Sequence, residues 1–270
     1  VFVDIDPFTL CIDPAEIEKA ITSRTKAIMP VHLYGHPADM KQIMVLASRH
    51  NLIVIEDAAE AHGARAYGKT VGGWGNCATF SFYGNKNITT GEGGMITTND
   101  HALNEKCRYL RDHAMSKEKR YWHTEVGYNY RMTNIQASIG CAQMNRLSEL
   151  MNKRQQLFGW YQAALADTPG VQLNRTAPWA TNSYWLICLE YDHWKSEQDR
   201  DNFMLRLKAS EVDSRPYFYP MTQMPYLVNN AHTPVTEQVY VKGINLPTFF
   251  DLTEAQVQFI CKAILDNLDA

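Results

Sequence analysis

Residues 78–94, ATFSFYGNKNITTGEGG, place a single lysine, Lys86, between a strand pattern and a glycine-rich turn. The first six residues alternate between apolar and polar side chains, as in a half-buried strand. GEGG at 91–94 is typical of a turn. A loop lysine is usually solvated, so the pattern around Lys86 must decide whether it is an ordinary surface residue or a nucleophile that holds a cofactor.

The composition of the 270 residues indicates an ordinary globular protein, with 45% hydrophobic and 20% charged residues. The formal net charge is -3, and no cluster of Lys and Arg is long enough to predict a nucleic-acid or membrane partner. No apolar run is long enough to cross a bilayer. Six dispersed cysteines without a CxxC motif favour a reduced, cytoplasmic setting.

The first half of the chain alternates between helix and strand patterns. Helices are predicted at 13–21, 37–50 and 100–113, and strands at 26–32, 52–57, 78–83 and 94–98. The stretch LIVIED at 52–57 is nearly all apolar, which is typical of a parallel strand covered on both faces. This order predicts an α/β fold with a mostly parallel sheet and helices on its faces.

The second half follows a different pattern. Helical spacing runs from Thr133 to about Leu165, and a strand (181–191), a helix (197–209), a strand-like piece (212–219) and a last helix capped by Thr253 follow. We therefore predict a large domain at 1–150 and a smaller α+β domain at 151–270. The opening VFVDID reads as a strand, so we expect the large domain to be incomplete at its N-terminus.

An acid and a lysine lie at the ends of two predicted strands. Asp57 ends LIVIED, and Lys86 follows ATFSFY. Because ligands gather at the carboxyl ends of parallel strands, both side chains can face one crevice. Pyridoxal phosphate needs such a pair: an amine that binds it covalently and a carboxylate against its pyridine nitrogen. Ser81 can hold its phosphate, and the small Ala59 leaves room for its ring.

The order of longer motifs resembles one known family. VHLYGHPADM (31–40), VIEDAAEAHGA (54–64), GNCATFSFYGNKNITTGEGGMI (75–96), GYNYRMTNIQASIG (127–140), SRPYFYP (214–220) and GINLP (243–247) stand as in the DegT/DnrJ/EryC1/StrS sugar aminotransferases. The resemblance covers essentially the whole chain and implies fold type I, the aspartate aminotransferase fold. It is greatest to members that move an amino group from L-glutamate to C4 of GDP-4-keto-6-deoxymannose for O-antigen synthesis.

The resemblance also implies roles for particular residues. Lys86 matches the lysine that binds the cofactor, and Asp57 matches the partner of its pyridine nitrogen. Glu60 matches a position near the ring hydroxyl of the cofactor, which is often Gln in relatives. Ser81 matches a ligand of the cofactor phosphate, and Asn129 matches a residue that reaches the phosphate of the neighbouring subunit in a homodimer. Relatives that dehydrate the same sugar carry His in place of the lysine, so Lys86 favours amino transfer. A GT turn that grips the phosphate precedes the matching region in the family, and we expect it to be missing here.

Substrate contacts are harder to predict. Arg215 is a candidate for a nucleotide phosphate, with a surface ion pair as the equal alternative. Tyr217 is a candidate wall of the sugar pocket, although core packing ranks first, and His123 is a weak candidate for the sugar nucleotide. His32 and His36 are four apart, but Gly35 and Pro37 favour a turn, so no metal site is expected. Amino transfer to a UDP- or dTDP-linked keto-sugar, and a non-catalytic partner or regulatory protein, remain the alternatives.

Overall fold

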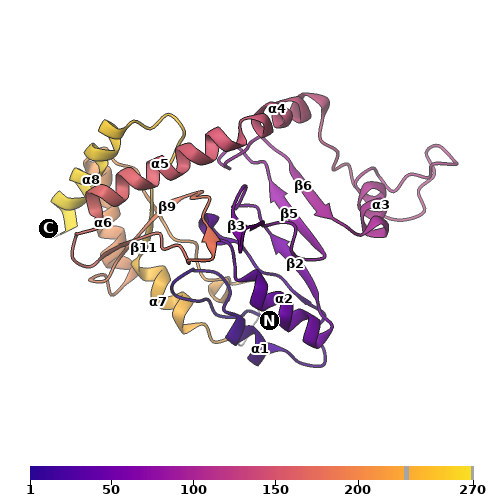
Figure 1. The fold of residues 1–270 in the computed structure, drawn as a ribbon, viewed down its shortest axis with the longest axis horizontal. Coiled ribbons are helices and arrows are strands. Elements are labelled where there is room, and N and C mark those ends of the chain that lie inside the picture. The colour runs from indigo at the N-terminus through magenta and orange to yellow at the C-terminus, as the bar shows by residue number, and fades with distance from the viewer. Residues whose placement is uncertain (228–230, 269–270) are drawn as a thin grey trace.

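The computed structural model describes residues 1–227 and 231–268 (Figure 1). Its helices are α1 (Pro14–Ala20), α2 (Met40–His50), α3 (His101–Leu110), α4 (Asn134–Asn145), α5 (Leu147–Leu165), α6 (Glu197–Ala209), α7 (Pro234–Lys242) and α8 (Glu254–Leu268), with 3-10 turns η1 (Leu33–Gly35) and η2 (Met221–Gln223). Its strands are β1 (Ala27–Ile28), β2 (Ile53–Asp57), β3 (Arg65–Ala66), β4 (Lys69–Thr70), β5 (Cys77–Ser81), β6 (Gly94–Thr98), β7 (Val171–Leu173), β8 (Ala180–Thr181), β9 (Ile187–Tyr191), β10 (Arg215–Pro216) and β11 (Gly243–Leu246).

The first sheet has the order β1-β2-β5-β6. β1, β2 and β5 run parallel, and β6 is antiparallel to β5. The predicted mixed, mostly parallel α/β sheet is therefore confirmed. Asp57, the last residue of β2, pairs with Thr79 of β5, so the carboxyl ends of the two strands lie side by side. This register places Asp57 close to the start of the loop that carries Lys86.

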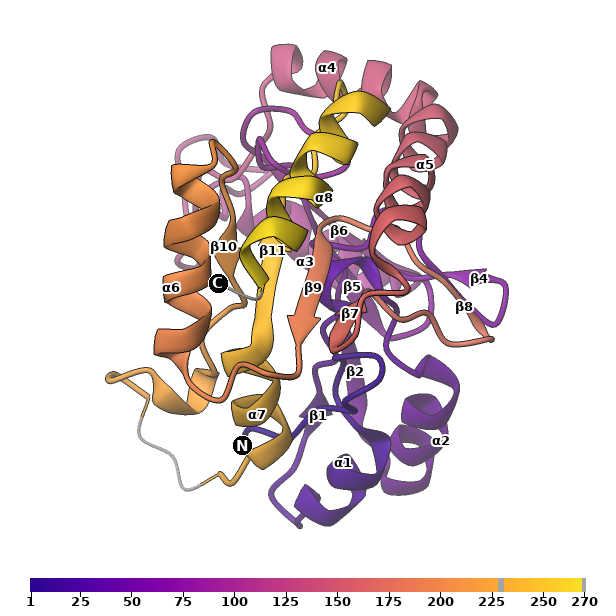
Figure 2. The same cartoon turned by 90° about the vertical axis from the view of Figure 1, so that its left-hand side faces the viewer.

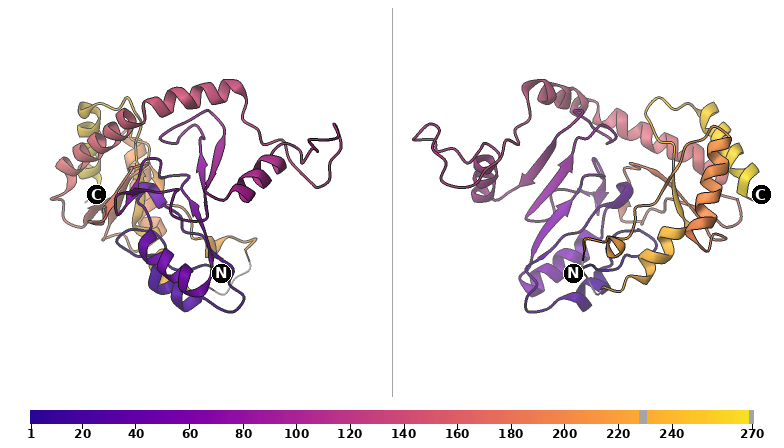
Figure 3. Two further views of the ribbon diagram at one scale, coloured as in Figure 1. Left: turned by 45° about the vertical axis from the view of Figure 1, so that its right-hand side comes forward. Right: turned by 180° about the vertical axis from the view of Figure 1, so that it is seen from behind.

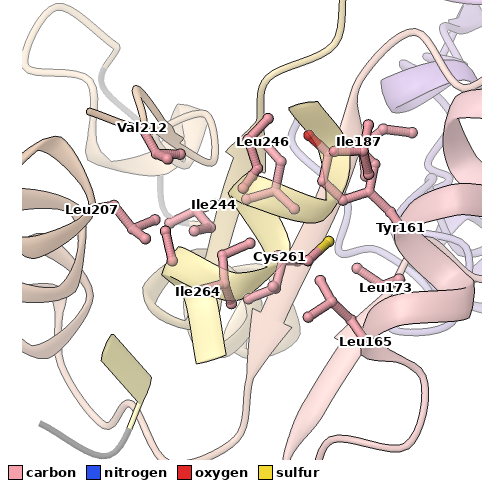
Figure 4. Packing of buried hydrophobic residues seen from close by; sticks show 14 of the residues in the cluster. Tyr161, Leu165, Leu173, Ile187, Leu207, Val212, Ile244, Leu246, Cys261 and Ile264 are labelled. Carbon is pink, nitrogen blue, oxygen red and sulfur yellow. The ribbon is translucent and has the colours of Figure 1, made fainter. Parts of the chain in front are cut away.

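The second sheet, β10-β11-β9-β7, is antiparallel throughout. α5, α6 and α8 cover one of its faces (Figure 2). Apolar side chains from these helices meet those of the sheet in one core, which includes Leu157, Leu189, Phe203 and Val257. Figure 4 shows part of this core, with Tyr161, Leu165, Leu173, Ile187, Leu207, Ile244, Leu246 and Ile264 labelled. A third sheet of short strands, β4-β3-β8, joins residues 65–70 to 180–181.

Some predicted elements differ from the observed ones. The opening VFVDID is not a strand, and only Ile5 forms a single bridge, with Ile12. The predicted strand 26–32 is reduced to Ala27–Ile28 because Pro30 has no N–H for a ladder, and pairing resumes only as a bridge at Val31. The long helix after Thr133 is interrupted at Arg146, which separates α4 from α5.

The division into domains at residues 150 and 151 stays a prediction. The largest hydrophobic cluster draws its members from residues 157–264, and a second cluster draws its members from residues 11–66. Within the part of the chain that the structure describes, no helix has both the length and the apolar composition needed to cross a membrane.

Candidate active site

Lys86 sits in a loop whose ends are closed by the backbone. Phe82 follows β5, donates its N–H to Gly93 O at 2.8 Å and accepts from Thr90 N at 2.9 Å. Lys86 N donates to Tyr83 O at 3.0 Å, which makes a turn of residues 83–86. Gly93 has φ +147°, a conformation that side chains rarely adopt. The glycine-rich stretch after Lys86 thus folds the chain back so that β6 can pair with β5.

The Lys86 side chain is largely buried and faces acids. Its Nζ lies 3.8 Å from Glu60 Oε1, and the two side chains are only 11% and 12% exposed. Glu60 Oε2 accepts the backbone N–H of Tyr34 at 2.9 Å, which fixes the carboxylate. Burial lowers the pKa of Lys86, against the opposing effect of Glu60 and Asp57. Burial also raises the pKa of Glu60 to about 7, although Tyr34 N–H and Lys86 favour the charged form.

The other predicted cofactor residues lie at the same end of the sheet. Asp57 Oδ1 accepts the N–H of Ala59 at 3.0 Å, which closes a tight turn after β2. Ser81 ends β5, and its Oγ accepts the N–H of Tyr83 at 3.3 Å. Asp57, Ala59, Glu60 and Ser81 are all partly exposed.

A segment from the C-terminal half, residues 182–186, braces the lysine loop and was missed by sequence reasoning. Trp185 Nε1 donates to Asn85 O at 2.8 Å, and Asn87 Nδ2 donates to Ser183 O at 3.2 Å. The Trp185 ring lies beneath the lysine, with Lys86 Nζ 3.6 Å from the ring centroid. The sequence predicts a strand over 181–191, and this is wrong for 182–186, which connect β8 to β9 outside any strand. No local signal in the sequence indicates the contact with the lysine loop.

Three buried polar atoms beside Lys86 lack hydrogen-bond partners within the described residues. Neither ring nitrogen of His62 has a hydrogen bond within the described residues, and neither does Asn87 Oδ1. Burial, followed by the charge of Lys86, lowers the pKa of His62 to about 4, and the nearby Ser81 backbone opposes this shift without forming a hydrogen bond. The His62 ring packs on Phe80 and Phe82 with both nitrogens unpaired, so it is not a hydrogen-bonded structural histidine.

These features fit pyridoxal phosphate. The cofactor needs an amine whose pKa is lowered, a carboxylate and neutral polar groups, and the site offers Lys86, Asp57 and the unpaired atoms of His62 and Asn87. Unsatisfied buried polar atoms normally indicate a partner that completes them. The residues present are therefore chemically suited to the group.

Asn129 and His123 lie elsewhere. Both are exposed and belong to the segment 111–133 between α3 and α4, which projects away from the sheets (Figure 1, Figure 3). Asn129 forms an isolated bridge with Asp112, and His123 Nδ1 lies 2.7 Å from His113 O. The structure does not bring either residue to Lys86 of the same chain.

The two substrate candidates near residue 216 differ in environment. Arg215 is exposed and belongs to none of the ion pairs among the described residues, so its predicted alternative, a surface ion pair, is not found. Tyr217 is 4% exposed, and its ring packs on Tyr34 with 5.1 Å between the centroids. Its hydroxyl donates to Glu190 Oε1 at 3.4 Å. Tyr217 is thus a core residue in this structure.

The two histidines considered for zinc have structural partners. His32 Nδ1 accepts the N–H of Ala38, and His32 Nε2 lies 3.1 Å from Glu56 Oε2. His36 Nδ1 lies 2.7 Å from Pro37 O, and its Nε2 accepts the N–H of Ala177. The 3-10 turn η1 separates them, as the predicted turn requires.

A cavity of about 950 Å³ lies close by but is not this site. It is lined mainly by apolar side chains from residues 1–34 and 217–240. Asp57 and Tyr217 border it, but Lys86, Glu60 and Trp185 do not. The chemistry-bearing residues therefore cluster beside the cavity.

Comparison with known proteins places this geometry in context. The chain is 48% identical over 267 residues to GDP-perosamine synthase of Caulobacter vibrioides and 41% identical over 265 residues to that of Escherichia coli O157:H7. Each alignment covers 98% of this chain, and 72% and 71% of the relatives. The fold is similar to that of Helicobacter pylori PseC, an aminotransferase involved in pseudoaminic acid biosynthesis. The TM-score is 0.94 at 29% identity, with 100% of this chain and 73% of the other covered.

The sequence pattern of one protein family matches residues 1–265. The match includes both strand ends with Asp57 and Lys86 and the bracing segment 182–186. The protein is therefore a pyridoxal-phosphate-dependent sugar aminotransferase, and the chain belongs to the DegT/DnrJ/EryC1/StrS aminotransferase family.

Proposed function

We propose that the protein transfers the amino group of L-glutamate to C4 of GDP-4-keto-6-deoxymannose and so makes GDP-perosamine for O-antigen synthesis. The observation that carries this proposal is the 48% identity to a GDP-perosamine synthase over 98% of the chain. The site supports it, because a buried lysine and a strand-end aspartate supply the two groups that amino transfer requires.

Pyridoxal phosphate, when bound, supplies an electron sink that stabilises negative charge at the substrate carbon. Lys86 would move the protons: its Nζ accepts the proton from Cα of L-glutamate in the first half-reaction and donates a proton to C4 of the sugar in the second. A base must be neutral to act, and burial of Lys86 lowers its pKa towards that state. Partial burial also keeps bulk water from competing for the proton.

The surrounding residues would hold the cofactor. The Asp57 carboxylate keeps a proton on the pyridine nitrogen, and Ala59 leaves room for the flat ring. Ser81 donates its hydroxyl to the phosphate, and Glu60 lies near the ring hydroxyl. Asn129 reaches the phosphate of a second subunit, which accounts for its place on an exposed, projecting segment. We place this homodimer in the cytoplasm, consistent with six cysteines that are all free thiols.

The substrate is tested by product analysis. The purified protein, with L-glutamate and added cofactor, is incubated with GDP-, UDP- and dTDP-linked 4-keto-6-deoxy sugars. We expect a 4-amino product from the GDP sugar and 2-oxoglutarate in equal amount. Product from the UDP or dTDP sugar alone would replace the GDP assignment by the alternative substrate class.

The role of Lys86 is tested separately by Lys86→Ala. We expect loss of the visible absorbance band of the lysine-linked cofactor and a fall of at least a thousandfold in kcat. Lys69→Ala, which alters an exposed lysine of β4, is the matched control and should leave both unchanged. A persistent band in Lys86→Ala would assign the linkage to another lysine, and no band in the unmodified protein would favour a non-catalytic partner or regulatory role.

A further inference from the structure

Trp185 makes two different contacts with the lysine loop. The edge of its indole donates Nε1–H to Asn85 O at 2.8 Å. The face of the same ring lies under the neighbouring side chain, with Lys86 Nζ 3.6 Å from the centroid. Because the edge is fixed to the residue before Lys86, the face is held against the Lys86 ammonium rather than meeting it by chance.

Further contacts immobilise the ring itself. Trp185 is 3% exposed and stacks with Tyr34 and Phe218, at centroid distances of 6.5 and 6.3 Å. Its carbonyl oxygen accepts from Arg154 Nη1 of α5 at 3.3 Å, and the same nitrogen donates to Thr248 O. Both the side chain and the backbone of Trp185 are therefore anchored, as a positioning residue requires.

The groups that face Lys86 come from several elements. Glu60, in the turn after β2, and Asp57, the last residue of β2, favour its charged form. His62 lies close enough that the two positive charges would repel, but burial keeps this imidazole neutral at physiological pH. Trp185 is the ring beneath the ammonium, and an aromatic face attracts a cation without carrying a charge of its own. Burial strips water from the ammonium, so this attraction is stronger than at the surface.

We propose that Trp185 is a positioning residue for Lys86, whose indole face holds the protonated amine in place and sets the pH at which that amine becomes a free base. This inference rests on the proposed role of Lys86. It has a chemical use: a lysine that moves protons must be released from its charged state and regain it in each cycle. A neutral π face stabilises the cation without the tight charge pairing that a further carboxylate would impose.

The test replaces Trp185 by tryptophans carrying one to four fluorine atoms on the indole. Fluorine withdraws charge from the ring face while shape and the Nε1–H group are kept, so the fold is not perturbed. The cofactor is removed from the full chain, and the rate at which added pyridoxal phosphate attaches to Lys86 is followed by absorbance across pH. Attachment needs the neutral amine, so the midpoint of the pH–rate profile reports the pKa of Lys86.

We expect the midpoint to move to lower pH with each fluorine, by about one pH unit across the series. Trp194, 5% exposed and packed on Phe203, is the matched control, and the same fluorination there should leave the midpoint unchanged. A flat series at Trp185, with attachment otherwise normal, overturns the inference and leaves the role of Lys86 intact. Absence of attachment in the unmodified chain overturns both.

Discussion

At the scale of single residues, Glu60 combines features that are rarely found together. One carboxylate oxygen is fixed by Tyr34 N–H, and the other faces Lys86 at 3.8 Å. Burial nevertheless raises the pKa of Glu60 to about 7. The hydrogen bond from Tyr34 and the charge of Lys86, whose own pKa is lowered, stabilise the carboxylate less than the water that burial removes. The carboxyl group can therefore exchange a proton near neutral pH, which a glutamine at the same position cannot do.

This property predicts a pH-dependent stability. Between the unfolded pKa near 4.5 and the folded value of about 7, the folded state binds the extra proton, so the free energy of unfolding falls as pH rises through this window. We expect the loss to reach at most about 3 kcal/mol. Glu60→Gln should remove it, measured as the difference between the urea-unfolding curves of the two proteins from pH 4.5 to 8. Glu18→Gln, at an exposed glutamate, is the control; equal slopes for wild type and Glu60→Gln would contradict the raised pKa.

At the scale of elements, the sequence predicts the two strand ends that carry Asp57 and Lys86. It does not predict the contact between the lysine loop and the bracing segment 182–186. The apolar run 52–57 and the alternation at 78–83 predicted two strands, and ligands gather at the carboxyl ends of parallel strands. The amino-acid pattern alone was therefore enough to predict that Asp57 and Lys86 can face one crevice. Trp185 is 99 residues from Lys86, and its contact depends on how the second sheet packs, which no local pattern encodes. The strand predicted at 26–32 failed for a local reason, since Pro30 interrupts the ladder.

The brace itself depends on close backbone packing at η1. Gly35 has φ +103°, and its oxygen accepts Ser183 N at 3.0 Å. A Cβ at Gly35 would lie 2.7 Å from Tyr184 N and 2.8 Å from both Ser183 Oγ and Trp185 N. These atoms belong to the segment that holds the lysine loop, so a methyl group there would push the segment away from Lys86.

Gly35→Ala should therefore lower the free energy of unfolding by about 2 to 4 kcal/mol, through backbone strain plus overpacking. It should also slow cofactor attachment to Lys86. The matched control is Gly68→Ala: Gly68 has φ +76° but nothing within 4 Å of the added carbon. It should show the strain alone, about 1 to 2 kcal/mol, with normal attachment. Equal decreases in the free energy of unfolding of both variants, measured by urea unfolding, would show that segment 182–186 accommodates the added carbon without loss of stability.

At the scale of the whole molecule, one stretch of the chain concentrates exposed apolar side chains to a degree that is unusual for a monomer. Residues 121–144 contain eight large apolar side chains that are each at least 44% exposed, namely Tyr121, Trp122, Val126, Tyr128, Tyr130, Ile135, Ile139 and Met144. Scattered exposed hydrophobics are ordinary, but such a concentration on one projecting segment and its following helix is typical of a protein interface. It supports the proposed homodimer.

Ile135→Asp places a charge on this surface, at a residue of α4 that is 76% exposed. We expect it to convert the dimer to monomers, with at least a hundredfold increase in the dissociation constant, because a buried unpaired carboxylate opposes association. Val45→Asp, at a 54% exposed position of α2, should leave the assembly unchanged. Sedimentation velocity over a range of concentrations distinguishes the two, and a dimer that survives Ile135→Asp would place the interface elsewhere.

If the dimer shares its active sites, two inactive proteins should restore each other. Lys86→Ala removes the lysine of its own site, and Asn129→Ala removes the residue proposed to reach its partner's site. In a mixed dimer, one site then combines the intact Lys86 of one chain with the intact Asn129 of the other, whereas the second site lacks both. Mixing the two variants under conditions that allow subunit exchange should recover roughly a quarter of wild-type activity at equal amounts, because half of the dimers are mixed and each has one complete site. If Asn129 served its own chain, every site in the mixture would lack one of the two residues, and activity would stay at the level of the separate variants.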